Sequence, residues 1–179
     1  MTTIQIKDKK FSLSIPEAEI LKAVREVGEA INRDLADKNP LFLCVLNGAF
    51  MFASDLMKTV TVPSEITFIK LSSYDGLYTT GSVKEIIGLN ESVVGRTVVV
   101  VEDIVDTGLT MERILDSLQA KGANEIRIAT FLQKPDALQR DITVDYVAMK
   151  IPNDFIVGYG LDYDGYGRNL KDIYTVVPE

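Results

Sequence analysis

The side chains best suited to chemistry gather in one stretch, residues 97–112, which contains four acids and no base. Its apolar strand, 98–101, ends in two adjacent carboxylates, Glu102 and Asp103, and the segment Asp106-Thr-Gly-Leu-Thr110 follows at the predicted start of a helix. Taken singly, each of these residues is typical of an exposed turn with an Asp or Thr helix cap. Taken together, they indicate a ligand site at the carboxyl end of a strand.

The segment 106–110 has the features of a phosphate-binding loop. It combines backbone N–H groups at a helix start, a glycine that permits close approach, and two threonine hydroxyls. It lacks the Gly-Lys-Ser/Thr of a P-loop, which disfavours a nucleoside triphosphatase. Glu102 and Asp103, at the strand end, are placed to accept hydrogen bonds from vicinal hydroxyls. A phosphate cradle beside two hydroxyl acceptors matches a ribose 5-phosphate.

Composition narrows the chemistry further. The 179-residue chain has no histidine and a single cysteine, so it has no Ser-His-Asp triad, Cys-His dyad, imidazole metal site or internal disulfide. Cys44 lies in the apolar run 41–46 and is expected to be a small buried side chain. Acid–base chemistry must then come from carboxylates, Lys or Tyr, and any metal must be a hard cation held by oxygens.

Net charge and hydropathy bear on the binding partners and the cellular location of the protein. A net charge of −7 argues against binding to nucleic acid or to an anionic membrane. Residues 1–10 contain no apolar signal-peptide core, and no apolar stretch reaches the roughly 18 residues of a membrane helix. With 46% hydrophobic residues and a length of 179, the sequence predicts one globular, cytoplasmic domain.

The elements that must position these residues alternate along the chain. Segment 14–38 has the apolar spacing of a helix, and Ser14 with Glu17 resembles a capping box. Further elements are predicted as helices at 49–58 and 107–121, strands at 41–46, 65–71, 97–101, 125–132 and 144–149, a short turn or helix at 135–140, and a long polar loop at 72–85. This alternation predicts an α/β fold, with a mostly parallel central sheet flanked by helices and ligands at the carboxyl ends of its strands.

The sequence Val101-Glu-Asp-Ile-Val-Asp-Thr-Gly-Leu-Thr110 resembles the motif with which type I phosphoribosyltransferases, in particular the hypoxanthine–guanine branch, bind 5-phosphoribosyl 1-pyrophosphate (PRPP). The resemblance extends over residues 42–175. It implies the type I phosphoribosyltransferase fold as a single domain over residues 1–179. A small hood would come from parts of the N- and C-terminal segments, including the N-terminal helix. A mobile lid at 72–85 would open with Ser73 and Tyr74.

The same resemblance assigns the contacts of the sugar and the pyrophosphate. The ribose and its 5′-phosphate would meet Glu102, Asp103, Asp106, Thr107, Gly108, Leu109 and Thr110. The pyrophosphate would meet Leu46, Asn47, Gly48 and Arg168, with a cis peptide between Leu46 and Asn47. The family frequently has Lys where Asn47 stands here. It also has a basic residue soon after the position of Lys134, which Pro135-Asp-Ala-Leu138 does not offer, and Arg140 lies farther along.

Contacts with a purine are implied on the C-terminal side of this motif. Lys134 would donate to the 6-oxo oxygen and so select 6-oxopurines over adenine, and Phe155 would stack on the base. Backbone carbonyls of Ile156 and Asp162 would accept from the exocyclic amine of guanine. Mg²⁺ would be held by Asp162, Glu102 and Asp103, which makes a charge of −7 compatible with a polyanionic substrate.

The reaction implied is transfer of 5-phosphoribosyl from PRPP to N9 of hypoxanthine or guanine through an oxocarbenium-like state, with Asp106 as acid or base at N7. The alternatives are a phosphoribosyltransferase for xanthine or another base, a non-catalytic PRPP-sensing regulator that binds RNA, and a flavodoxin-like binding module. The charge of −7 argues against the RNA-binding regulator. The family also implies a homodimer or homotetramer, to which Phe50-Met-Phe52 contributes either a contact or core.

Overall fold

The computed structural model describes residues 2–72 and 84–178 of the chain. The predicted lid residues Ser73 and Tyr74 lie outside these described residues. In chain order the elements are β1 (Thr3–Ile6), β2 (Lys9–Ile15), α1 (Glu17–Asp34), β3 (Leu41–Leu46), α2 (Phe50–Thr59), β4 (Glu65–Ser72), β5 (Lys84–Ile87), β6 (Thr97–Val105), α3 (Leu109–Ala120), β7 (Glu125–Gln133), the 3-10 turn η1 (Pro135–Ala137), β8 (Tyr146–Lys150), β9 (Ile156–Val157) and β10 (Ile173–Val176).

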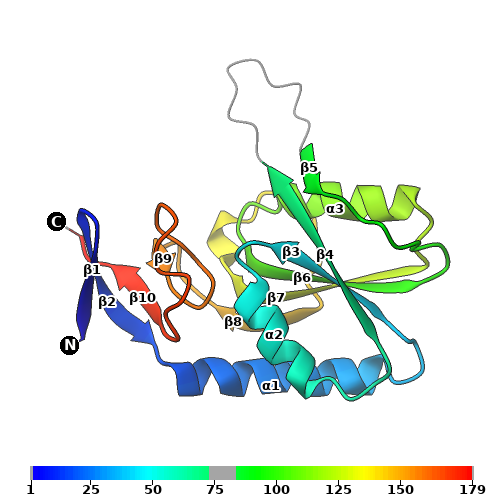
Figure 1. Cartoon of the computed structure of the whole chain (residues 1–179), viewed down its shortest axis with the longest axis horizontal. Helices are drawn as coiled ribbons and strands as arrows, with labels where there is room; N and C mark the ends of the chain where they lie inside the picture. Colours follow the sequence, from blue (N-terminus) through cyan, green and yellow to red (C-terminus); the bar gives the residue numbers. More distant parts are fainter. Residues whose placement is uncertain (1, 73–83, 179) are drawn as a thin grey trace.

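A six-stranded sheet forms the centre of the molecule. Its strand order is β5-β4-β3-β6-β7-β8, and every neighbouring pair is parallel except β4 and β5. Helices α1 and α2 cover one face of this sheet and α3 covers the other (Figure 1). The predicted α/β fold, with a mostly parallel sheet flanked by helices, is confirmed.

Strand β3 and residues 98–101 of β6 are apolar throughout, because they are buried between the two helical layers. Successive side chains of a strand point to opposite faces, so Phe42 and Val99 join the core under α1 and α2. Leu43 and Val100 join the second core, under α3. Phe52 of α2 is fully buried in the first core, so of the two aromatic residues in 50–52 only Phe50 is exposed.

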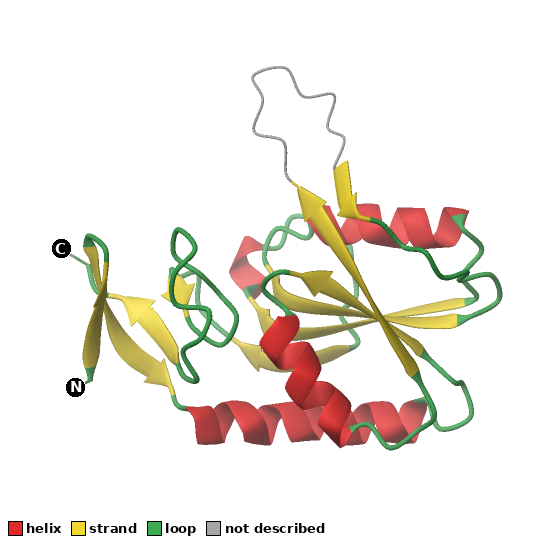
Figure 2. Cartoon of the chain, in the orientation of Figure 1, coloured by secondary structure: helices red, strands yellow, loops and turns green. Residues whose placement is uncertain are grey.

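A second, four-stranded sheet joins the two ends of the chain. Its order is β1-β2-β10-β9, all pairs are antiparallel, and a small core of Phe11, Val157 and Tyr174 lies on it. Figure 2 shows this sheet apart from the central one. Helix α1, which the resemblance assigns to the hood, shares one core cluster with the central sheet and with Ile156 of β9 and Ile173 of β10. Its apolar stripe, including Ile20 and Val24, packs in that core.

The start of α1 differs from the predicted capping box. Ser14 lies in β2, and its hydroxyl donates to the carbonyl of Ile173 at 3.1 Å. The helix begins at Glu17, whose N–H donates to the carboxylate of Asp172 at 2.7 Å. A carboxylate near the C-terminus therefore accepts from a backbone N–H at the helix start, the role that the local sequence assigned to Ser14.

Within the described residues, no helix is long and apolar enough to cross a membrane.

Candidate active site

Glu102 and Asp103 lie near the carboxyl end of β6, which continues past the predicted strand end to Val105. Glu102 is buried, and one of its carboxylate oxygens accepts from the N–H of Asp103 at 3.0 Å. Asp103 is half-buried and accepts from the N–H of Ile104 at 2.7 Å. Burial, together with the negative charge of Asp103, raises the pKa of Glu102 well above its usual value of 4.5. A cation or hydroxyl donor beside the pair would relieve this repulsion.

The phosphate-binding loop predicted at 106–110 forms the turn from β6 into α3. Gly108 stands directly before the helix with φ of 89°, a conformation that favours glycine. The N–H of Leu109 points to the hydroxyl of Thr107 at 3.4 Å. Asp106 is exposed, and within the described residues its carboxylate has no hydrogen-bond or ion-pair partner. A hollow of about 80 Å³ opens here, lined by Glu102, Ile104, Val105, Asp106, Thr107, Gly108, Thr110 and Met111.

A larger adjoining hollow, of about 330 Å³, brings the predicted pyrophosphate and sugar residues together. Its lining consists of Val45, Leu46, Asn47, Gly48, Leu71, Glu102, Asp103, Ile104, Thr110, Asp162 and Arg168. The Leu46–Asn47 peptide is cis, as expected. A Cβ on Gly48 would lie 1.7 Å from the Asp103 carboxylate, so the absence of a side chain at 48 leaves room for that carboxylate.

Asp162 and Arg168 line the larger hollow together with the 46–48 loop and the Glu102–Asp103 pair. The guanidinium of Arg168 lies 3.2 Å from the Asp162 carboxylate and donates to the carbonyl of Gly160 at 2.7 Å. The other oxygen of Asp162 accepts from the N–H of Gly165 at 2.8 Å. A Cβ on Gly160 would lie 2.3 Å from the carbonyl oxygen of Gly48, so these two loops are in direct backbone contact. Arg168 is thereby presented as a fixed planar donor.

The predicted purine-binding residues other than Asp162 lie outside the linings of both hollows. Lys134 directly follows β7, and its N–H donates to the carbonyl of Val105 at 3.0 Å. Its ammonium has no partner among the residues that the structure describes. Phe155 is 46% exposed, which leaves one part of its ring open to a flat ligand. Ile156, in β9, is buried.

Two tyrosine hydroxyls that the sequence interpretation did not single out hold the loop of Asp162. The hydroxyl of Tyr159 donates to the carboxylate of Asp55 in α2 at 2.5 Å. The hydroxyl of Tyr163 donates to Asp8, between β1 and β2, at 2.6 Å, and its ring stands edge-on to Phe155 at 5.7 Å. No local pattern could have revealed these pairs, because their members lie more than 100 residues apart.

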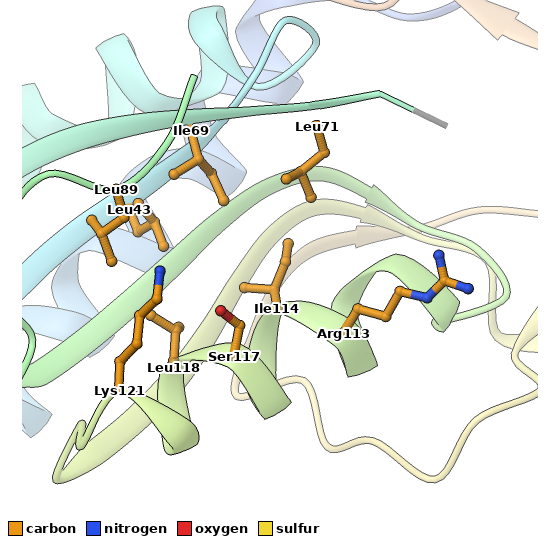
Figure 3. A pocket seen from close by; sticks show the side chains of 9 residues that line it. All are labelled: Leu43, Ile69, Leu71, Leu89, Arg113, Ile114, Ser117, Leu118 and Lys121. Atoms are coloured by element: carbon orange, nitrogen blue, oxygen red, sulfur yellow. The ribbon is translucent and has the colours of Figure 1, made fainter. Parts of the chain in front are cut away.

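A separate hollow on the α3 side of the sheet has a different character (Figure 3). It has a volume of about 150 Å³ and is lined by Leu43, Ile69, Leu71, Leu89, Arg113, Ile114, Ser117, Leu118 and Lys121. None of the predicted site residues lines it. We therefore place the candidate active site at the carboxyl ends of β3 and β6, where the predicted ribose and pyrophosphate residues meet.

Comparison with known proteins identifies the family. Residues 16–164 match the sequence model of the phosphoribosyl transferase domain. The chain belongs to the phosphoribosyltransferase family. The family resemblance expected from residues 101–110 is thus confirmed.

Relatives within the phosphoribosyltransferase family cover nearly all of the chain. It is 43% identical over 167 residues to the hypoxanthine-guanine phosphoribosyltransferase of Streptococcus mutans, covering 89% of this chain and 93% of that protein. It is 41% identical over 166 residues to the bifunctional protein TilS/HprT of Listeria monocytogenes, covering 92% of this chain but only 26% of that longer protein. A crystal structure of a hypoxanthine phosphoribosyltransferase from Staphylococcus aureus superposes with a TM-score of 0.88 at 38% identity, covering 93% of this chain and 91% of that one.

Proposed function

We propose that the protein transfers the 5-phosphoribosyl group of PRPP to N9 of hypoxanthine or guanine, giving IMP or GMP and pyrophosphate in purine salvage. One observation carries this function: the hollow in which the 46–48 loop, the Glu102–Asp103 pair and the Asp162–Arg168 pair meet beside the phosphate cradle. The names of the relatives support a 6-oxopurine as the acceptor. The small sheet of β1, β2, β9 and β10 would serve as the hood of a single domain.

The sugar and its phosphates bind on the β6 side. The N–H groups of residues 107–110 and the hydroxyls of Thr107 and Thr110 donate to the 5′-phosphate at the start of α3. Glu102 and Asp103 accept from the ribose hydroxyls. The backbone of 46–48 and the guanidinium of Arg168 donate to the pyrophosphate. The pyrophosphate leaves with the electron pair of the bond between its oxygen and C1′.

The acidic side chains of the hollow fit Mg²⁺. Glu102, Asp103 and Asp162 offer carboxylate oxygens there, and Mg²⁺ is usually held by one or two carboxylates plus substrate oxygens. Within residues 2–72 and 84–178, no cluster of protein side chains would hold a metal alone, which suits a cation that binds together with PRPP. When bound, the cation neutralises charge on the leaving pyrophosphate.

The purine binds beyond the lining of the larger hollow, next to Asp162. The free ammonium of Lys134 donates to the 6-oxo oxygen, the exposed face of Phe155 stacks on the base, and the carbonyls of Ile156 and Asp162 accept from an exocyclic amine. As N9 bonds to C1′, the purine loses a proton from N7, and the unpaired carboxylate of Asp106, on the cradle, accepts it. Residues 72–85, beginning with Ser73 and Tyr74, would exclude water from the sugar cation as a lid.

The deciding experiment measures IMP formation from PRPP and hypoxanthine, with Mg²⁺ present or chelated. We expect turnover only with Mg²⁺, similar turnover with guanine, and none with adenine. Asp106→Asn should lower kcat about 100-fold and leave the KM for PRPP within about twofold. Asp116→Asn, on the exposed face of α3, is the matched control and should change neither constant. An unchanged kcat in Asp106→Asn would refute the role of Asp106 in proton transfer. A wild type that prefers xanthine would refute hypoxanthine and guanine as the substrates.

The proposed enzyme is cytoplasmic and a homodimer or homotetramer. Three exposed apolar side chains on α2 and β4, namely Phe50, Ile66 and Phe68, support a contact between subunits. Light scattering should give a mass of two or four chains, and Phe68→Glu should shift it toward one chain. A monomeric wild type would exclude this assembly.

A further inference from the structure

A short segment after η1, residues 138–142, packs directly behind the phosphate cradle. A Cβ on Gly108 would lie 3.1–3.2 Å from side-chain atoms of Leu138, Arg140 and Ile142. The N–H of Gln139 in the same segment donates to the carbonyl of Thr107 at 2.9 Å. The turn that presents N–H groups to a phosphate is therefore held from behind by a segment 30 residues farther along the chain.

Arg140 also places a positive charge at this end of α3. Its guanidinium Nε lies 3.5 Å from the carboxylate of Glu112, which is in the first turn of the helix. A carboxylate there is favourable to the helix itself but repels a phosphate bound at the same end. Both side chains are nearly half exposed, so the pair contributes little to the stability of the fold. Its main consequence is electrostatic, because Arg140 offsets Glu112 beside the cradle.

We propose that Arg140 is a positioning residue for the 5′-phosphate of PRPP. It buttresses the Gly108 turn from behind and cancels the charge of Glu112, so that the cradle meets the phosphate in a fixed shape and without local repulsion. Arg140 is the first basic residue after Lys134. This role rests on the proposed phosphoribosyl transfer.

The test compares substitutions that separate the charge of Arg140 from its size. Arg140→Gln should raise the KM for PRPP about fivefold while kcat and the KM for hypoxanthine stay within about twofold. Arg140→Lys, which keeps the charge, should stay within about twofold of the wild type. Arg33→Gln is the matched control, because Arg33 forms a similar loose pair with Asp34, at 3.4 Å, near the end of α1. It should change nothing.

The charge of Glu112 gives a second, independent readout. Glu112→Gln in the Arg140→Gln background should return the KM for PRPP to within about twofold of the wild type, because the uncompensated carboxylate is then gone. Three outcomes would overturn the proposal. They are an unchanged KM for PRPP in Arg140→Gln, an equal rise in Arg140→Lys, and a KM for PRPP that Glu112→Gln does not restore. An equal rise in the KM for hypoxanthine would also overturn it, since a general distortion would cause that.

Ribose 5-phosphate separates this inference from the proposed function. The increase in melting temperature that it produces should be smaller in Arg140→Gln than in the wild type, whether or not transfer occurs. A wild type that forms no IMP but shows this difference overturns the proposed reaction and supports Arg140. A wild type that forms IMP with equal increases in both proteins overturns the role of Arg140 alone.

Discussion

The sugar-phosphate side and the purine side of the candidate site are built in different ways. The sugar-phosphate side consists of consecutive residues, 102–110, at the junction of β6 and α3, and much of what it offers is backbone N–H groups. The purine side, Lys134, Phe155, Ile156 and Asp162, comes from the end of β7, from β9 and from the loop that follows. Side chains from α2 and the β1–β2 turn hold that loop.

This difference has a physical consequence. A strand-to-helix turn fixes its own backbone donors through local hydrogen bonds, so distant substitutions should disturb it little. Side chains gathered from separate segments stand in the correct place only while their long-range contacts persist. The exception on the sugar-phosphate side is Arg140, which acts on that turn from outside.

The largest effect should follow from a substitution where the two sides meet. Gly48 contacts Asp103 on one side and Gly160 on the other. Gly48→Ala should displace the Asp103 carboxylate and lower kcat/KM for both substrates about 100-fold, with little change in melting temperature. Steady-state kinetics with each substrate varied would measure this. Gly95→Ala is the control for an added methyl group away from the site: a Cβ there meets nothing within 4 Å, but φ is 69°, so the variant should lose stability and keep full activity. A loss confined to one substrate would mean that the two sides are not joined at Gly48.

A smaller and one-sided effect is expected at Lys134. Lys134→Met removes the ammonium donor and should raise the KM for hypoxanthine about 30-fold, because a hydrogen bond from a charged group is worth about 2 kcal/mol. The KM for PRPP should change less than about twofold. Lys150→Met, on an exposed lysine of β8, is the control. Equal increases in the two KM values would contradict a division of the site into two independent sides.

Tyr159 tests the long-range support of the purine side through pH. Burial and the hydrogen bond to Asp55 raise the pKa of Tyr159 above its usual value of 10.0. Above pH 10 the unfolded chain ionises this phenol while the folded chain keeps its proton, so stability falls as pH rises from 10 through the higher folded pKa. At pH 8, Tyr159→Phe should lower the free energy of unfolding by about 1 kcal/mol, and this difference should shrink above pH 10. Urea unfolding at both pH values would measure it, and a constant difference would refute the assignment.

The smallest effect should come from Tyr163. Tyr163→Phe keeps the ring that stands beside Phe155 but loses the hydrogen bond to Asp8, so the KM for hypoxanthine should rise about threefold. The KM for PRPP should not change. Tyr166→Phe is the matched control, since the ring of Tyr166 lies 5.3 Å from the ammonium of Lys7 and its hydroxyl is not needed for that contact. A rise in the KM for PRPP instead would assign this hydrogen bond to the sugar-phosphate side.

Prediction of the fold from sequence succeeded where burial leaves a strong pattern. The strand at 41–46 was correct, because it lies inside the central sheet, where its core demands apolar residues. The strand at 65–71 was one residue short. The small sheet was missed. Its strands are short and partly exposed, with Thr and Gln in β1 and Lys and Ser in β2. Strand β2 also pairs with β10 more than 150 residues away, as in the pair Ser12 and Thr175. Nothing local indicates that pairing.

The sequence by itself determined the sugar-phosphate side and the family, because nine consecutive residues carry both the acids and the phosphate-binding turn. Only the tertiary structure decided the rest. It put Asp103 against Gly48, paired Asp162 with Arg168, and set Arg140 behind Gly108. These contacts depend on chain segments brought together by the packing of the sheet and its loops. A sequence pattern records the local requirements of a turn, whereas a contact between distant segments exists only after the core has formed.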